Sequence, residues 1–464
     1  MHDSLHYLTI EEAAAGLRGK RFSVRQLVEA HLTRIEALDA KLHAFITLTA
    51  DKALAEAADA DNELARGVDR GPLHGMPIAH KDIIQTAGVR TTAHSRSLQH
   101  WTPEQSATVH EKLRAAGAIN LGKTSLHEFA FGSPGEDEAF PAARNPWNVE
   151  HMPGSSSSGS GAAVAAGLCI AATGTDTGGS VRHPAAVCGI VGMKPTFGRV
   201  SNFGVLPLAP TMDHVGPLTR TVVDNAIMLQ AMAGHDPRDP ASLDATPGDF
   251  RSLIGRPLRG MRVGVLRRFI DSIEHTPDTL AAFGEAEAAL RDLGCVMVDV
   301  DPVGLAQSHD AGSLVITYEA YRYHRKNLEE RPGDYSANFR GRFAKAPAMT
   351  EADYEGAKAR MATLRRSLAR MFESDVDVVI NPGRERPAQT MAELWADPLG
   401  KRSLALRMYS VTGNPALVLP MGFTRDALPL GLQIAAPHWR EDVAYQVAHA
   451  YEQATGWHTR HPIP

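Results

Sequence analysis

The chain has 464 residues, of which 43% are hydrophobic and 22% charged, the ordinary composition of a globular protein with a large core. Its net charge is −5 and neither sign runs in blocks, so the sequence predicts no nucleic-acid partner and no membrane partner. Three well-separated cysteines argue against a disulfide framework or a zinc site. The N-terminus lacks a signal-peptide pattern and the longest apolar run, 162–172, is too short to cross a bilayer, so we expect a cytoplasmic protein.

Predicted strands and helices alternate along most of the chain. Two N-terminal helices are predicted near 24–38 and 53–66. The elements that follow are, in chain order, strand 77–80, helix 106–116, strand 118–122, helix 162–168, strand 170–173, helix 222–233, strand 261–266, helix 277–293, strand 296–300, a mostly helical region at 311–372, strands 376–380, 416–419 and 431–434, and helix 443–455. This alternation is typical of an α/β fold in which helices cover both faces of one sheet.

The segment 154–182 carries the strongest chemical signal in the sequence. It places two Ser/Gly-rich turns, 154–160 and 178–180, on either side of a short Ala-rich helix. Two serines and several backbone N–H groups can therefore converge on one point, as a serine nucleophile and its oxyanion hole require. The best candidate for the base is Lys81, because the strand before it should be buried and burial lowers the pKa of a lysine.

Other interpretations of these residues have less support. A Ser/Gly run is commonly a flexible linker, but this run adjoins a packed helix and joins no domains. It approaches a phosphate-binding loop without the lysine of that motif. Residues 176–178 spell Asp-Thr-Gly, yet aspartic protease chemistry needs a second such carboxylate, and no second triplet occurs. No Gly-x-Ser-x-Gly elbow surrounds Ser156 or Ser180. With 21 histidines in the chain, a Ser–His–Asp triad stays open.

Lys81, Ser156 and Ser180, with their surroundings, resemble the amidase signature family of Ser–Ser–Lys hydrolases. The resemblance covers nearly the whole chain and is densest over 152–220. The intervals of 75 residues from Lys81 to Ser156 and 24 residues from Ser156 to Ser180 also fit the family's triad. The resemblance implies that Ser180 is the nucleophile, that Ser156 relays its proton, and that Lys81 is the base.

The same resemblance implies roles for the neighbouring residues. The peptide bond before Ser156 would be cis. Arg182 would pair with Asp176 or with a backbone carbonyl, and contact with a substrate carboxylate is the alternative. The oxyanion would be bound by backbone N–H groups of Thr177, Gly178 and Gly179, and the loop would be supported by Ser157, Asp176 and Arg182.

One departure from the family pattern concerns the first turn. The common loop reads Gly-Gly-Ser-Ser-Gly-Gly-Ser, whereas here Ser155 and Ser158 replace glycines. A different register would make Ser155 or Ser157 the bridging residue, but the 24-residue interval to Ser180 favours Ser156.

The resemblance further implies a single α/β/α domain over 1–464 around a large mixed sheet. Its core would lie near 70–230, and a divergent, mostly helical region on the substrate side near 310–410. The pocket would be lined by that region and by a loop carrying Ala130, Phe131 and Gly132. A partly aromatic pocket is suggested by four residues that are, at this density, more often part of a core: Tyr318, Tyr321, Tyr323 and Phe339.

These observations predict a hydrolase of C–N bonds in small-molecule carboxamides that forms an acyl-enzyme on Ser180, with carbamates (urethanes) and esters as further substrates. The alternative is the A subunit of a tRNA-dependent amidotransferase, which 233–239 also resemble. No His-Glu-x-x-His or paired Cys-x-x-Cys motif occurs, so we expect no metal and no cofactor. The expected partner is a small amide or carbamate alone, bound by a monomer or homodimer.

Overall fold

The computed structural model describes residues 2–397 and 403–462, and these residues are arranged around one mixed sheet. Residues 398–402, part of the expected helical region, lie outside the described residues. Within the described residues the sheet has eleven strands, in the order β1-β3-β2-β4-β6-β5-β10-β11-β9-β7-β8. Their bounds are β1 Phe45–Leu48, β2 Pro77–Lys81, β3 Ile119–Thr124, β4 Ala171–Asp176, β5 Val191–Lys194, β6 His214–Thr219, β7 Arg262–Val265, β8 Val296–Asp299, β9 Val378–Pro382, β10 Ala416–Phe423 and β11 Pro429–Ala435.

Local sequence explains where several helices begin. Thr9, Ser23 and Thr350 each form a capping box with the residue three positions on, which satisfies backbone N–H groups of the first turn. The described helices are α1 Ile10–Arg18, α2 Val24–Leu42, α3 Ala50–Ala65, α4 Thr108–Ala115, α5 Ser158–Ala165, α6 Arg182–Cys188, α7 Val222–Met232, α8 Arg267–Asp271, α9 Pro277–Asp292, α10 Leu305–Glu330, α11 Ala337–Gly341, α12 Glu351–Ser374, α13 Met391–Ala396, α14 Leu404–Thr412 and α15 Glu441–Thr455.

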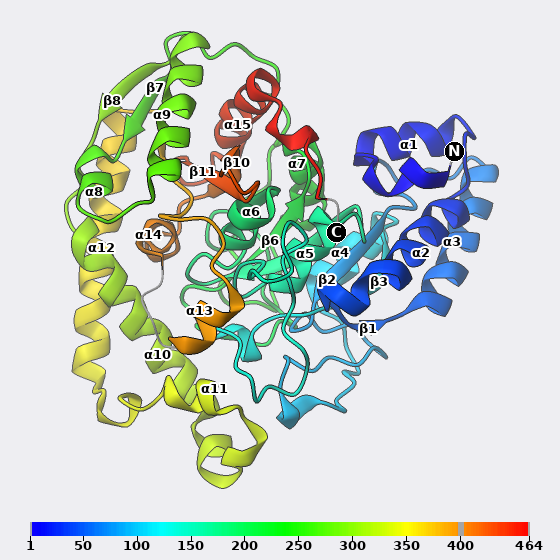
Figure 1. The fold of residues 1–464 in the computed structure, drawn as a ribbon, viewed down its shortest axis with the longest axis horizontal. Helices are drawn as coiled ribbons and strands as arrows, with labels where there is room; N and C mark the ends of the chain where they lie inside the picture. Colours follow the sequence, from blue (N-terminus) through cyan, green and yellow to red (C-terminus); the bar gives the residue numbers. More distant parts are fainter. Residues whose placement is uncertain (1, 398–402, 463–464) are drawn as a thin grey trace.

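Helices cover both faces of the sheet, which confirms the predicted fold class. Successive strand residues point to opposite faces. In β9, Val378 and Ile380 belong to the core cluster that includes α9 and α15, whereas Val379 belongs to a second cluster with α10, α12 and α14. Figure 1 shows α10 and α12 running side by side at one end of the molecule, away from α1, α2 and α3.

The middle of the sheet sets the geometry of the site. Strand β2 lies between β3 and β4 and is parallel to both, with Ile78 opposite Ala171 and His80 opposite Thr173. Because parallel strands end at the same edge of a sheet, the last residue of β2, Lys81, lies near the end of β4.

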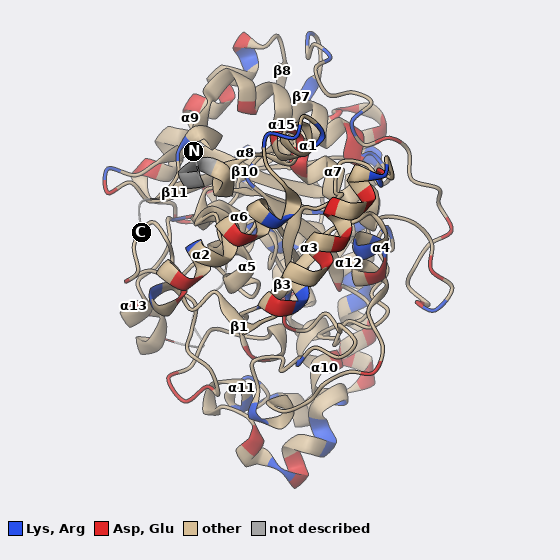
Figure 2. Ribbon diagram, turned by 90° about the vertical axis from the view of Figure 1, so that its right-hand side faces the viewer, with Lys and Arg blue, Asp and Glu red and all other residues tan. Residues whose placement is uncertain are grey.

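The charge of the molecule is mixed on the side that Figure 2 presents. There α2 carries both signs and α3 mainly acidic residues. None of the described helices combines the length and the apolar composition needed to cross a bilayer.

Candidate active site

Three chain segments meet where β2 and β4 end. Strand β2 ends at Lys81, the loop before α5 carries Ser156, and the turn after β4 carries Ser180. The N–H of Ser157 donates to the carbonyl of Ser180 at 3.3 Å, which joins the loop to the turn.

The side chain of Lys81 is fully buried at this junction. Its Nζ donates to Ser156 Oγ at 2.8 Å and to Thr175 Oγ1 at 2.7 Å. Burial lowers the pKa of Lys81 to about 7, although the carboxylates of Asp176 and Asp213 oppose this change. A neutral amine that can accept a proton from Ser156 is therefore accessible near neutral pH.

The loop before α5 directs one serine toward the lysine. The Ser155–Ser156 peptide bond is cis, as the resemblance implies. The hydroxyl of Ser157 instead donates to the carbonyl of Thr175 and accepts its N–H, both at 3.2 Å, and so ties the loop to β4. Lys81 therefore contacts the hydroxyl of Ser156 and not that of Ser155 or Ser157, so Ser156 occupies the bridging position.

The turn after β4 presents Ser180 to a cavity. Ser180 is partly exposed, whereas Ser156 is 1% exposed. Among the described residues, no hydrogen bond joins the two hydroxyls directly. Gly179 has a φ of +122°, and a Cβ at this position would lie 2.7 Å from Cβ of Leu406, so the turn requires glycine there.

The predicted oxyanion donors differ in their availability. The N–H of Gly179 donates to Asp176 Oδ1 at 2.8 Å. Thr177 and Gly178 line the cavity beside Ser180, and no acceptor for their N–H groups occurs in the described part of the chain. These two N–H groups can therefore face a substrate carbonyl, while that of Gly179 holds the turn.

Arg182 and Asp176 form a buried ion pair beneath the turn. Arg182 Nη2 and Nε lie 2.8 and 2.9 Å from the Asp176 carboxylate oxygens, and Nη1 donates to the carbonyl of Leu406 at 2.6 Å. Burial alone would raise the pKa of Asp176, but the Arg182 guanidinium holds that pKa well below its usual value. Arg182 is thus engaged with a carboxylate and with a backbone carbonyl, and it is fully buried.

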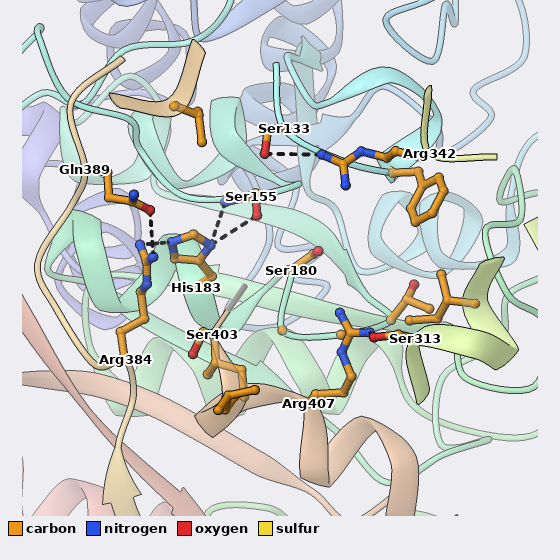
Figure 3. A pocket seen from close by; sticks show the side chains of 18 of the residues that line it. Ser133, Ser155, Ser180, His183, Ser313, Arg342, Arg384, Gln389, Ser403 and Arg407 are labelled. Carbon is orange, nitrogen blue, oxygen red and sulfur yellow. Dashed lines mark hydrogen bonds between the residues drawn. The ribbon is translucent and has the colours of Figure 1, made fainter. Parts of the chain in front are cut away.

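A cavity of about 1020 Å³ opens above Ser180. Ala130 and Phe131 lie in its wall, whereas Gly132 has a φ of +104° and packs against the side chain of Arg342. Figure 3 shows Ser180 with Arg384 on one side and with Arg342 and Arg407 on the other.

Arginines contribute much of the polar lining of the cavity. Arg384 Nη1 lies 2.6 Å from His183 Nε2 on one side of Ser180, and Arg407 Nη1 donates to Ser313 Oγ at 2.6 Å on the other (Figure 3). The cavity lining therefore carries cations on both sides of the candidate nucleophile, together with the carboxylates of Glu274, Glu385, Glu393 and Asp397.

None of the four aromatic residues expected in the pocket lines this cavity, so that expectation is wrong. Phe339 is 2% exposed and stacks on Tyr335, with ring centroids 5.2 Å apart, inside the core between α10 and α11. Among the tyrosines of α10, Tyr318 donates to Glu351 at the start of α12, Tyr321 packs against Phe343 with ring centroids 5.9 Å apart, and Tyr323 is 50% exposed. Apolar packing between helices, not substrate binding, accounts for Phe339.

Metal and thiol chemistry find no support in the described residues. No group of three or more His, Cys, Asp or Glu side chains there is arranged to hold a metal ion. Burial raises the pKa of the Cys169 thiol to about 12 and of the Cys295 thiol to about 11, and it raises that of Cys188 further. These thiols are therefore protonated and unreactive near neutral pH.

A family model described as Amidase matches residues 26–443. The chain belongs to the amidase signature family. A curated relative, the A subunit of glutamyl-tRNA(Gln) amidotransferase from Thermosynechococcus vestitus, is 39% identical over 480 residues, which cover 98% of this chain and 99% of the relative.

Solved structures of amidase signature enzymes share the fold. The peptide amidase of Stenotrophomonas maltophilia is 31% identical with a TM-score of 0.84, and the match covers 97% of each chain. A second structure is described by the words "An unexpected vestigial protein complex reveals the evolutionary origins of an s-triazine catabolic enzyme". It is 31% identical with a TM-score of 0.90, over 97% of this chain and 99% of that chain.

The expectation of a small molecule as the only partner, with no nucleic acid, is wrong for this amidase signature protein. The curated relatives are named for a tRNA and as subunits of a larger enzyme. The expectation rested on a net charge of −5, which describes the average surface of one chain. Average charge says nothing of the other proteins with which a chain assembles.

Sequence reasoning about this amidase signature chain missed Thr175, Arg384 and Arg407. Thr175 could have been found, because it lies near the end of the strand beside Lys81. The two arginines lie more than 200 residues beyond Ser180 and belong to no motif, so only the tertiary structure brings them to the cavity.

Proposed function

We propose that this chain hydrolyses a carboxamide through an acyl-enzyme on Ser180, as the glutaminase-type subunit of an amidotransferase. The observation that carries amide hydrolysis is the 2.8 Å hydrogen bond from buried Lys81 to Ser156, in the loop joined to Ser180. The assignment to an amidotransferase is supported by 39% identity, across 98% of the chain, to a protein named as the A subunit of glutamyl-tRNA(Gln) amidotransferase.

The proposed reaction begins with proton transfer along the serines. Ser180 Oγ attacks the carbonyl carbon while its proton passes to Ser156 Oγ, and the Ser156 proton passes to Lys81 Nζ. A pKa of about 7 for Lys81 makes the neutral amine available for this step near neutral pH. The tetrahedral oxyanion accepts hydrogen bonds from the N–H groups of Thr177 and Gly178, two residues that line the cavity.

The leaving group then takes the proton back. Lys81 returns its proton through Ser156 to the nitrogen, so ammonia or an amine departs and an ester to Ser180 remains. Water, deprotonated along the same path, attacks this ester and releases the acid. The Asp176–Arg182 pair and the Ser157–Thr175 hydrogen bonds support the loop and turn during both steps.

A second candidate is an amidase that acts alone on small molecules. It is favoured by the 31% identity and TM-score of 0.84 to the peptide amidase of Stenotrophomonas maltophilia. The same carbonyl geometry also fits carbamates and esters, which stay predicted substrates of this candidate.

The test measures ammonia release from L-glutamine by the purified chain, alone and co-purified with the partner subunits of its source, with the Ser180→Ala variant as the control for contamination. Turnover that requires the partners supports the amidotransferase assignment. Hydrolysis of peptide amides or anilides by the chain alone, unchanged by partners, supports the second candidate. No C–N cleavage in any arm overturns amide hydrolysis.

A further inference from the structure

The segment that follows β9 places one arginine in the cavity wall. Arg384 is 7% exposed, and its guanidinium lies beside His183 and Gln389 (Figure 3). Its Nη2 donates to Gln389 Oε1 at 3.1 Å, and its Nη1 lies 2.6 Å from His183 Nε2. Nε is buried and has no hydrogen-bond partner among the described residues. Because the N–H of Ser155 donates to His183 Nδ1, Nε2 of the neutral imidazole carries the hydrogen and cannot accept from Nη1, so one of the five N–H donors of Arg384 is engaged.

The groups that hold Arg384 do not balance its charge. An imidazole and an amide oxygen contact it, and neither is a carboxylate. The adjacent Glu385 is turned toward α14, where its carboxylate accepts the N–H groups of Leu404 at 2.7 Å and Ala405 at 3.0 Å. Burial lowers the pKa of Arg384 to about 10, although the negative charge of Glu385 opposes this change.

The same arginine is linked to the catalytic loop. His183 Nδ1 lies 3.1 Å from both the N–H and the hydroxyl of Ser155, the residue before Ser156. A ligand that binds Arg384 is therefore held at a fixed place relative to the loop that carries Ser156. The guanidinium of Arg407 packs instead against Gly178, in the turn that carries the predicted oxyanion donors.

We propose that Arg384 binds a carboxylate carried by the substrate, so that the chain selects carboxamides that also bear a carboxylate. This inference rests on the proposed amide hydrolysis at Ser180. A planar guanidinium matches a carboxylate in geometry, and a buried charge is stable when it is paired. The cavity of about 1020 Å³ has room for such an amide to reach Arg384 and Ser180 together.

The first test compares matched substrates of the unaltered protein, assayed alone and co-purified with its partner subunits. Malonamate, succinamate and glutaramate are assayed beside propanamide, butanamide and pentanamide, which replace the carboxylate by a methyl group. We expect one of the carboxylate-bearing amides to have a kcat/KM at least about 30-fold above that of its neutral partner. Equal or better turnover of every neutral partner overturns the inference but leaves amide hydrolysis intact. No turnover of any amide would instead count against the proposed function.

The second test removes the guanidinium. Arg384→Gln should raise KM for the preferred carboxylate substrate at least about 30-fold and change that for the neutral partner little. Arg384→Lys keeps a charge without the planar fork and should recover part of the preference. The matched control is Arg425→Gln, which removes the same charge from an exposed residue outside the cavity lining, and should change the ratio of kcat/KM for the two substrates by less than about threefold.

A structural role for Arg384 gives a different pattern. If it only supports His183 and the loop, Arg384→Gln should lower kcat for charged and neutral amides alike, and Arg384→Lys should do the same. That outcome overturns the inference, as does an equal change of the kcat/KM ratio in Arg425→Gln. If Arg384→Gln does not fold, the Arg384→Lys ratio and competitive inhibition of the unaltered protein by glutarate, compared with glutaramide, decide the question.

Discussion

The ammonium nitrogen of Lys81 lies 2.8 Å from the hydroxyl oxygen of Ser156, and both side chains are shielded from water. A lysine in this position is tuned as a base by burial and not by a neighbouring cation, since the largest cause of its lowered pKa is desolvation. The pH dependence of the reaction rate should therefore follow the protonation of one buried amine, that of Lys81.

Ser180→Ala should abolish amide turnover, with kcat falling by roughly 10⁴-fold or more, because the acyl-enzyme cannot form. Ser180 is partly exposed in a turn, so the midpoint of thermal unfolding should stay close to that of the unaltered protein. Ser155→Ala is the informative comparison, since that hydroxyl contacts His183 and not Lys81. A larger loss in Ser155→Ala than in Ser180→Ala would mean that the nucleophile has been misassigned.

The pH dependence of kcat/KM should follow the charge of Lys81. The base must be neutral in the free enzyme, so kcat/KM should rise with pH, about tenfold per unit on the acid side, and level off above about 7. Lys81→Ala should remove the rising limb and most of the rate, whereas Lys41→Ala, at an exposed lysine, should leave both unchanged. A flat profile from pH 5 to pH 9 in the unaltered protein would contradict a lysine base.

Lys81 and Ser156 should behave as one unit. Since Ser156 passes its proton to Lys81, Ser156→Ala combined with Lys81→Ala should cost little more in kcat than Lys81→Ala alone. The measurement is a double-mutant cycle on kcat at a pH above 8, where the unaltered base is neutral. Fully additive losses would show that the two residues do not share a proton path, and the base would then have to be sought among the histidines.

Asp176→Asn should lower the free energy of unfolding by about 3–5 kcal/mol, because buried Arg182 loses its carboxylate. The folded-state pKa of Asp176 is lowered, so its contribution is fully present above the usual Asp pKa of 3.8 and is lost as pH falls through the lowered value. The difference between the two proteins should be constant from pH 7 to pH 5 and shrink in stronger acid. Denaturant unfolding measures it, with exposed Asp244→Asn as the control.

Prediction from the sequence succeeded best at segments in which a secondary-structure pattern and catalytic residue types occur together. The strand ending at Lys81 and the two Ser/Gly turns carry both a structural and a chemical signal, and they are neighbours in space. Strand β6 escaped prediction because Gly216 and Pro217 interrupt its apolar pattern, and Pro is uncommon inside a sheet. The lining of the cavity could not be predicted, because the periodicity of a helix does not distinguish an aromatic residue of the core, such as Phe339, from one in a cavity wall.

The two halves of the sheet have separate tasks, and this division has a practical consequence. Lys81, Ser156 and Ser180 are held by strands that pair within 77–219, whereas a second group, the segment 383–389 with Arg384, follows β9 in the other half. A substitution in the second group changes what the cavity attracts without disturbing the register that places the base. Directed evolution toward new amides should therefore concentrate its libraries on 383–389 and leave the strands of the first half untouched.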